Sequence, residues 1–309
     1  MARVLGRFGG WLNQQAYLLV CLTYLMWSLN IVLGRHIAGV IPPVTLGFIR
    51  WAIGAVILLP FAWPYLKRDW PAIRSHIPIL SLLGVTGTTG YAIPSYWGLQ
   101  YTLAINGLLI QCTMPMVIGL MSYLLVGDRL NRWQVVGIVV SFIGVVVILT
   151  RGDPDVLHSI SFNRGDLWFL LAMLIFALYS PLLRKRPAIH PISFLAITAI
   201  LGTLWVLPLV AWEVSHLGIP SFDAHRIAVV MYMAIFPSLI AYICYNRGVQ
   251  LLGPNPVAAL YPLIIVFGSI QAMLFLGEVP QWFHFVGTVF IVGGVLLATR
   301  MAAGAKPAA

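Results

Sequence analysis

The chain has 309 residues, of which 61% are hydrophobic and 8% are charged, and its mean hydropathy is +0.95. A soluble globular protein carries about one quarter charged residues, so this composition excludes that class. Apolar runs of about 20 residues favour membrane-spanning helices over a β-barrel, whose strands alternate at every second residue. The net charge of +10 is expected to set orientation and to face anionic headgroups rather than to bind nucleic acid.

Ten apolar spans are predicted in chain order, which makes the fold class an all-α membrane protein. They lie at about 17–34, 44–66, 78–99, 103–126, 133–150, 166–183, 191–213, 226–247, 255–276 and 282–299. The first apolar run follows Arg3 and Arg7, as in a signal peptide. At about 18 residues it is too long for the hydrophobic core of a signal peptide, and no small-residue cleavage site follows, so it is predicted to be an uncleaved span.

The two sets of five spans repeat one another at an offset of 150 residues. The matching positions are Gly98 and Gln100 with Gly248 and Gln250, Gly127-Asp128 with Gly277-Glu278, Gly137 with Gly287, and Gly144 with Gly294. Because five is odd, the second copy starts on the opposite side of the membrane, which is the inverted repeat of many secondary transporters. The predicted segments are an N-terminal segment at 1–16, a first repeat at 17–150, an external loop at 151–165, a second repeat at 166–300 and a tail at 301–309.

Positive charge predicts the orientation. Of the 18 Lys and Arg residues, the external side would hold Arg35, Arg151, Arg164 and Arg226 if the N-terminus were inside, and Arg50 would lie within a span. All the others would then be cytoplasmic, as the positive-inside rule requires. Both termini are therefore expected in the cytoplasm, with the protein in the inner membrane of the cell.

The sequence offers little for catalysis or for ion coupling. Cys21, Cys112 and Cys244 lie within apolar spans without metal-ligand spacing, so no disulfide and no metal site are predicted. The motifs of soluble hydrolases, zinc proteases and nucleotide-binding enzymes are absent, so neither an enzyme activity nor a cofactor is expected. No acid or histidine falls at mid-depth of a span, which favours facilitated diffusion or exchange over tight proton coupling.

Arg50 is the first candidate functional residue, because a cation within a span is costly and often functional. It could bind a substrate carboxylate or act at a gate. The alternative is a structural arginine that snorkels or donates to backbone carbonyls.

Polar and aromatic residues recur on single helical faces and predict a central cavity. The candidate substrate-binding residues are Trp27, Asn30, Thr88, Tyr91, Ser95, Asn106, Gln111, Tyr179, Ser238, Tyr242, Tyr245 and Tyr261. Each could instead form an interhelical hydrogen bond or lie at the membrane interface.

Prolines and glycines add structural expectations. Five prolines within spans would kink helices as gates or would simply bend them: Pro94, Pro115, Pro181, Pro237 and Pro262. The glycines at the fifth and tenth spans are seven residues apart, which predicts close helix packing either within a monomer or across a homodimer.

The chain resembles the drug/metabolite transporter superfamily, EamA type, over about residues 17–300. The first copy carries this resemblance in Trp27 to Asn30, Pro43 followed by Arg50, Gly98 to Gln100, Pro115, Gly127 to Leu130, Trp133 and Gly137. The second copy carries it in Gly165-Asp166, Gly248 to Gln250, Gly277-Glu278, Trp282 and Gly287. Asp128 stands where the family usually has Glu. The resemblance implies ten helices, both termini inside, and export of amino acids or metabolites; among the branches, the chain is similar to YddG-type aromatic amino acid exporters.

The predicted function is therefore export of amino acids, aromatic or otherwise apolar, by alternating access around a central cavity. Aromatic rings would stack on the substrate side chain, and amide and hydroxyl groups would bind its ammonium and carboxylate. The expected partners are this small-molecule substrate and the lipid bilayer. An exporter of drugs, nucleosides or other metabolites is the alternative, and a membrane-embedded enzyme is a further one, although no nucleophile and base lie together at one depth.

Overall fold

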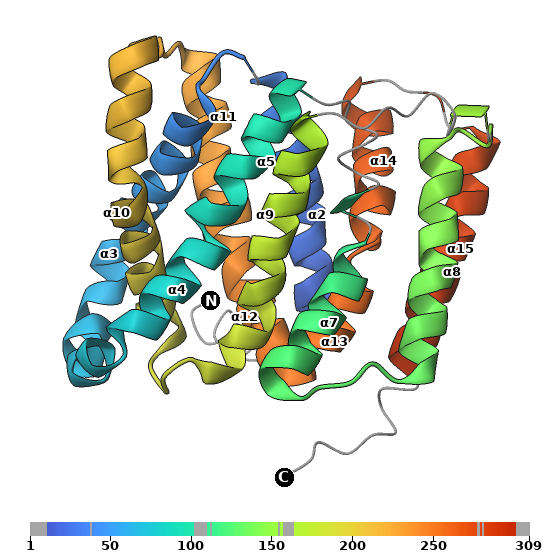
Figure 1. Cartoon of the computed structure of the whole chain (residues 1–309), viewed down its shortest axis with the longest axis horizontal. Coiled ribbons are helices and arrows are strands. Elements are labelled where there is room, and N and C mark those ends of the chain that lie inside the picture. Colours follow the sequence, from blue (N-terminus) through green and yellow to red (C-terminus); the bar gives the residue numbers. More distant parts are fainter. Residues whose placement is uncertain are drawn as a thin grey trace. The chain divides into compact units, whose positions relative to one another are not determined.

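The computed structural model describes residues 11–37, 39–101, 110–111, 113–153, 155–156, 164–276, 279 and 281–300, and every regular element among them is helical (Figure 1). The α-helices are α2 (Ala16–His36), α3 (Pro43–Ser75), α4 (Ile77–Gly87), α5 (Thr89–Tyr101), α7 (Met114–Val126), α8 (Arg132–Leu149), α9 (Arg164–Leu182), α10 (Pro191–Leu217), α11 (Ala224–Ala234), α12 (Ala241–Leu252), α13 (Pro254–Ala259), α14 (Leu263–Leu276) and α15 (Trp282–Arg300). A 3₁₀ turn, η2 (Leu183–Lys185), follows α9, and a π-helix, η3 (Ile235–Ile240), joins α11 to α12.

Within the described residues, eight helical runs are long and apolar enough to cross a membrane. They coincide with the predicted spans 2, 3 and 5 to 10. Two shorter apolar helices, Ala16–Ile31 and Met114–Val126, fall at the predicted spans 1 and 4. The all-helical fold class is confirmed for the described residues, whereas the count of ten spans and the orientation stay predictions.

The described chain divides into two compact units that cut across the two sequence repeats. The first unit comprises Met1–Leu29, Ala104–Phe162 and Cys244–Ala309, and the second comprises Asn30–Leu103 and Asn163–Ile243. The first unit therefore joins α7 and α8 to their repeat counterparts α14 and α15. The second joins α3 and α4 to their counterparts α10 and α11, and it also holds α5 and α9. Each unit thus contains a piece of both repeats.

In the first unit, α8 and α15 run side by side, and their glycines make the contact (Figure 1). A methyl group added to Gly137 would collide with the carbonyl oxygen of Gly294, and one added to Gly144 would collide with that of Gly287. The pairs run in opposite chain directions, so the helices are antiparallel. The glycine faces predicted for close packing are therefore used within the chain, which is one of the two expected outcomes.

In the second unit, α3 and its counterpart α10 cap each other. Pro42 precedes α3 and its side chain makes no capping hydrogen bond. Instead, Glu213 near the end of α10 accepts hydrogen bonds from the backbone N–H groups of Val44 at 3.2 Å and Thr45 at 2.7 Å, and from the Thr45 hydroxyl at 2.7 Å. A carboxylate there satisfies free N–H groups and the positive end of the helix dipole.

The other end of this helix pair repeats the arrangement. Asp69 of α3 accepts a hydrogen bond at 2.8 Å from the backbone N–H of His190, the residue that precedes α10. Burial alone would raise the pKa of the Asp69 carboxyl, but the His190 hydrogen bond and the Arg68 charge outweigh it and lower that pKa. Because this pKa is lowered, the Asp69 contact stabilises the folded protein at pH values above the pKa. The stabilisation is lost as the pH falls through the pKa. Each helix thus holds the start of its counterpart.

Glu213→Ala should lower the stability of the folded protein by about 3 kcal/mol, because it leaves three buried donors without an acceptor. The thermal unfolding midpoint of the purified protein in detergent measures this loss. Asp223→Ala is the matched control, since Asp223 caps α11 by the same kind of bond from Arg226 N–H but is 57% exposed, and its loss should cost about 1 kcal/mol. Equal midpoints for the two variants would contradict the assigned role of Glu213.

Two of the spans are irregular at equivalent positions of the repeat. Span 3 is divided at Thr88, whose backbone leaves the helical region with φ −115° and ψ −95°. Its repeat counterpart Ser238 lies within the π-helix η3. Both hydroxyls donate back to their own helix, Thr88 to the Gly84 carbonyl at 2.5 Å and Ser238 to that of Met233 at 2.7 Å. The bends therefore follow the inverted repeat.

The five predicted kink prolines occupy different settings. Pro181 lies inside α9, one residue before its end. Pro237 lies in η3, and Pro262 lies in the turn between α13 and α14. Pro115 stands in the first turn of α7, where a proline costs no hydrogen bond. Pro94 lies inside α5, away from the break at Thr88. A gating role for any of them stays a prediction.

Candidate functional site

Arg50 is the centre of the candidate site in the second unit. It lies about two turns into α3 and is 4% exposed. Its Nη1 donates hydrogen bonds to the Tyr96 hydroxyl at 2.7 Å and to Asn30 Oδ1 at 3.3 Å. The guanidinium lies 5.5 Å from the ring centre of Trp51 and 5.8 Å from that of Tyr96. Among the described residues, no carboxylate lies within ion-pair distance of it.

Two donors in this group lack an acceptor. Arg50 Nε and Trp51 Nε1 are buried and have no hydrogen-bond partner among the described atoms. Buried donors are satisfied in more than nine cases out of ten, so a neighbouring pair without acceptors needs an explanation. A ligand that offers acceptor oxygens would satisfy both. We refer to Asn30, Arg50, Trp51 and Tyr96 as the Arg50 cluster.

A row of aromatic rings continues from the Arg50 cluster. The Trp51 ring meets Tyr242 edge to face at 4.9 Å, and Tyr242 lies 6.0 Å from Tyr179. Phe176 lies 5.8 Å from Tyr179 and 5.1 Å from Tyr91. The Tyr242 hydroxyl donates to the Gly87 carbonyl, next to the break at Thr88. This aromatic row therefore links α3, α5, α9 and α12 within the second unit.

The first unit holds a separate group, which we call the aromatic box: Tyr24, Trp27, Tyr245 and Tyr261. Ring centres lie 5.9 Å apart for Tyr24 and Trp27, 5.3 Å for Tyr24 and Tyr261, and 5.1 Å for Trp27 and Tyr245. The Tyr261 hydroxyl donates to Gln111 Oε1 at 3.2 Å. These two residues are repeat counterparts, 150 positions apart, so two equivalent positions of the repeat contact each other directly.

A buried acceptor also lies in the first unit. Asn255 Oδ1, on α13, has no donor among the described atoms, and the residue is 5% exposed. The Arg50 cluster lacks acceptors for its donors, and α13 lacks a donor for its amide oxygen.

The predicted binding residues fall into three groups. Asn30, Tyr91, Tyr179 and Tyr242 join the Arg50 cluster or the aromatic row, and Trp27, Gln111, Tyr245 and Tyr261 join the aromatic box or bond to it. The hydroxyls of Thr88, Ser95 and Ser238 donate to carbonyls of their own helices, which leaves only their lone pairs for other partners. Asn106 lies outside the described residues.

Sequence reasoning missed Trp51, Tyr96 and Tyr24. A signal for Trp51 and Tyr96 existed in the cost of burying Arg50, because a buried guanidinium needs aromatic faces and oxygen acceptors nearby. Tyr24 lies three residues before Trp27, so the two rings share one helical face. The spacing rule that selected the other candidates would therefore have selected Tyr24 as well.

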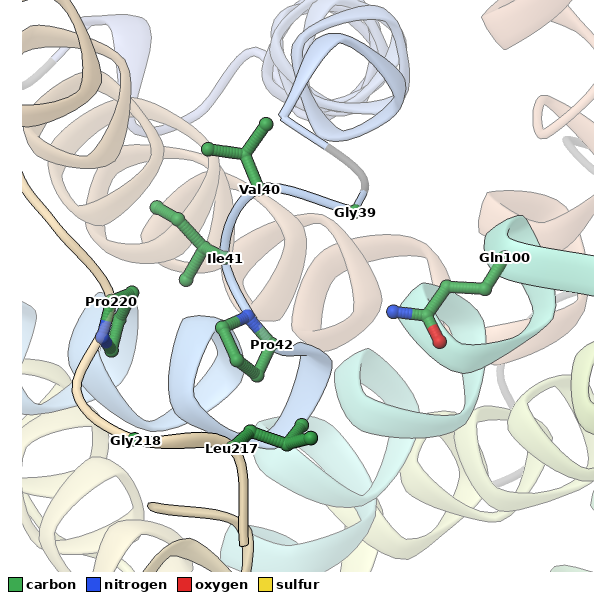
Figure 2. Close-up of a pocket in the computed structure, with 8 residues that line it drawn as sticks. All are labelled: Gly39, Val40, Ile41, Pro42, Gln100, Leu217, Gly218 and Pro220. Atoms are coloured by element: carbon green, nitrogen blue, oxygen red, sulfur yellow. The ribbon is translucent and has the colours of Figure 1, made fainter.

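A pocket of about 290 Å³ lies in the second unit where α3 begins and α10 ends (Figure 2). Its walls are Gly39, Val40, Ile41, Pro42, Gln100, Leu217, Gly218 and Pro220. Figure 2 shows the Gln100 amide directed toward Pro42, and the other labelled side chains are apolar. None of the predicted substrate-binding residues lines this pocket, so it is not the Arg50 cluster.

Comparison with known proteins identifies the family. The EamA-like transporter family matches residues 14–150 and 163–300, which is both repeats. The chain belongs to the EamA-like transporter family. This confirms the family predicted from the sequence, and it makes the chain a multi-pass membrane transporter of small molecules, in a family of transporters rather than enzymes.

Three curated relatives illustrate the range of cargo. The uncharacterized transporter YyaM of Bacillus subtilis is 24% identical over 86% of this chain and 88% of its own length. A probable terminal-alkyne amino-acid exporter of Streptantibioticus cattleyicolor is 26% identical over 83% of this chain and 84% of its own. An S-adenosylmethionine uptake transporter of Rickettsia felis is 24% identical over 87% of each chain. One solved crystal structure shares the fold with a TM-score of 0.75 at 20% identity, covering 94% of this chain and 98% of that one.

Proposed function

We propose that this EamA-like transporter exports amino acids with apolar or aromatic side chains, as YddG-type exporters do. The observation that carries this proposal is the buried Arg50, which has no acid partner among the described residues and an Nε without an acceptor. The carboxylate of an amino acid would provide the missing charge and the missing acceptors.

The geometry of the guanidinium favours one carboxylate. Its hydrogen bonds to described residues all come from Nη1, and the edge formed by Nε and Nη2 makes none. This edge is one that binds a carboxylate through two parallel hydrogen bonds. Trp51 Nε1 offers a third donor beside it. A cargo with several negative charges would need further buried cations, and none is predicted within a span.

The neighbouring rings suit an apolar side chain. Along the aromatic row, the Trp51 ring lies against Tyr242, and Tyr242 lies against Tyr179. A substrate ring stacked on such a row gains about 0.5–1.5 kcal/mol beyond burial. The relative named as an amino-acid exporter supports this substrate class. S-adenosylmethionine, named for another relative, also bears an α-amino acid group, although that protein is named for uptake.

Transport would proceed by alternating access. The bends at Thr88 and Ser238 sit at equivalent positions of the inverted repeat, where the two ends of the pathway could open in turn. Among the described residues, the buried acids Glu213 and Asp166 lie near helix ends, so neither is placed at mid-span to carry protons. We therefore expect exchange or facilitated diffusion across the inner membrane, with both termini in the cytoplasm.

Export from cells tests this function. Cells that express the chain and are loaded with a phenylalanine-containing dipeptide should release phenylalanine faster than cells that express Arg50→Gln at the same membrane level. The same assay with adenosine tests the nucleoside alternative, and with S-adenosylmethionine it tests that relative's cargo. If cells that express the chain release phenylalanine no faster than cells that express Arg50→Gln, with both proteins confirmed in the membrane, amino acid export through Arg50 is contradicted.

A further inference from the structure

Helix α3 is longer than the membrane requires. Its 33 residues extend about 50 Å at 1.5 Å per residue, against about 30 Å for the hydrocarbon core. The predicted span ends at Leu66, so the segment from Lys67 to Ser75 continues as a helix beyond it. Its repeat counterpart α10 has 27 residues and ends at Leu217. The extension is therefore a property of one copy only.

The end of the predicted span and the extension together carry a stripe of alternating aromatic and basic residues. Trp63, Lys67, Trp70 and Arg74 are spaced by four, three and four residues, so they share one face of α3. All four are exposed, and the two tryptophans are each 53% exposed. Lys67 Nζ lies 5.1 Å from the centre of the Trp63 ring. We call these four residues the α3 stripe.

A different face of the same segment is packed inside the second unit. Ala62 and Ile73 are buried, and Asp69 is bound to the His190 backbone. The Tyr65 ring stacks on His190 at 3.7 Å, which brings the chain that follows the basic residues Arg184 and Lys185 against this end of α3. These contacts fix the backbone of α3 on one face, while the α3 stripe stays exposed on another.

We infer that the α3 stripe binds the headgroups of anionic phospholipids. Exposed tryptophans favour the depth of the headgroups, where the ring meets both the apolar and the wet layer. Lys67 and Arg74 lie one helical turn from these rings and would pair with lipid phosphates. The charge bias of the chain assigns this end of α3 to the cytoplasmic leaflet.

The sequence repeat supports a specific role for the stripe. Its counterparts on the opposite face of the inverted repeat are Glu213, Leu217, Pro220 and Ala224, at the same offset of 150. None of these is basic, and none is aromatic. The stripe is therefore not a feature that α3 shares with its counterpart, and it fits only the leaflet that carries negative charge.

Lipid titration of the purified full-length protein tests the inference. The thermal unfolding midpoint is measured in detergent as phosphatidylglycerol, phosphatidylcholine or inorganic phosphate is added, because a ligand that binds the folded state raises the midpoint. Phosphatidylglycerol should stabilise the wild type most. In the double variant Lys67→Gln/Arg74→Gln, the concentration for half-maximal stabilisation should rise about 25-fold, since each basic residue near the surface contributes about fivefold.

Arg129→Gln/Arg132→Gln is the matched control. It removes the same charge from two exposed arginines that are also predicted to be cytoplasmic and that also lie beside aromatic rings, Tyr123 and Trp133. It should shift the half-maximal concentration much less than the α3-stripe variant does, because Arg129 and Arg132 do not share one helical face with two exposed tryptophans. The inference is overturned if both double variants shift equally, if phosphatidylcholine stabilises as well as phosphatidylglycerol, or if inorganic phosphate alone gives the full effect.

Discussion

Arg50→Gln is expected to weaken the apparent affinity for phenylalanine by about tenfold to a hundredfold. Hydrogen bonds to a charged group contribute about 1.5–3 kcal/mol, and each 1.4 kcal/mol is about tenfold in affinity. The affinity for phenylalaninol, which has the same ring and ammonium but no carboxylate, should stay within about twofold. Competition against labelled phenylalanine in proteoliposomes gives both values.

Two further variants separate substrate binding from structure. Trp51→Phe keeps a ring beside Tyr242 but removes the Nε1 donor, so it should cost about three- to tenfold for phenylalanine. Arg184→Gln removes an exposed arginine of the second unit and should change neither affinity. If Arg50→Gln weakens phenylalanine and phenylalaninol alike, Arg50 acts through Asn30 and Tyr96 as a structural residue, and the carboxylate assignment fails.

Gly294→Ala should strongly destabilise the first unit. The added methyl group would meet the carbonyl oxygen of Gly137 and the backbone N–H of Ser141, and backbone atoms cannot rotate away as a side chain can. Forcing two packed helices apart costs about 3 kcal/mol or more. The yield of monodisperse protein and the thermal midpoint should both fall.

The neighbouring glycine is the control. A methyl group at Gly293 meets nothing within 4 Å among the described atoms. Gly293→Ala should therefore be neutral, or should stabilise α15 by up to about 1 kcal/mol through helix propensity. If Gly293→Ala and Gly294→Ala behave alike, α8 and α15 do not pack through these glycines in the membrane.

The repeat visible in the sequence anticipated much of the local structure. Glycines seven residues apart predicted a close helix contact, and Gly137 and Gly144 make it with the glycines of the second copy. The Ser141 hydroxyl donates to the carbonyl of its own counterpart, Ile291. The sequence could not show that the compact units would mix the two repeats, because an offset identifies equivalent helices but not the helices that they touch.

The candidate site was only partly predictable. Arg50 stood out because a charge within a span is costly. The cost of burying it also indicated that aromatic rings and oxygen acceptors lie nearby. Which residues provide them could not be read from the sequence, because Tyr96 lies on another helix. The break at Thr88 contains no proline, and a hydroxyl that donates to its own helix looks in the sequence like one that faces a substrate. Such choices depend on tertiary packing rather than on spacing.

Counterflow in proteoliposomes tests the central claim most directly. Vesicles that contain the wild-type protein are preloaded with phenylalanine, with phenylalaninol or with buffer alone, and uptake of labelled phenylalanine is followed over time. Transient accumulation in the vesicles loaded with phenylalanine, and little or none in those loaded with phenylalaninol, is the predicted result. Equal accumulation with both, or none with either, would contradict transport of an amino acid bound through its carboxylate.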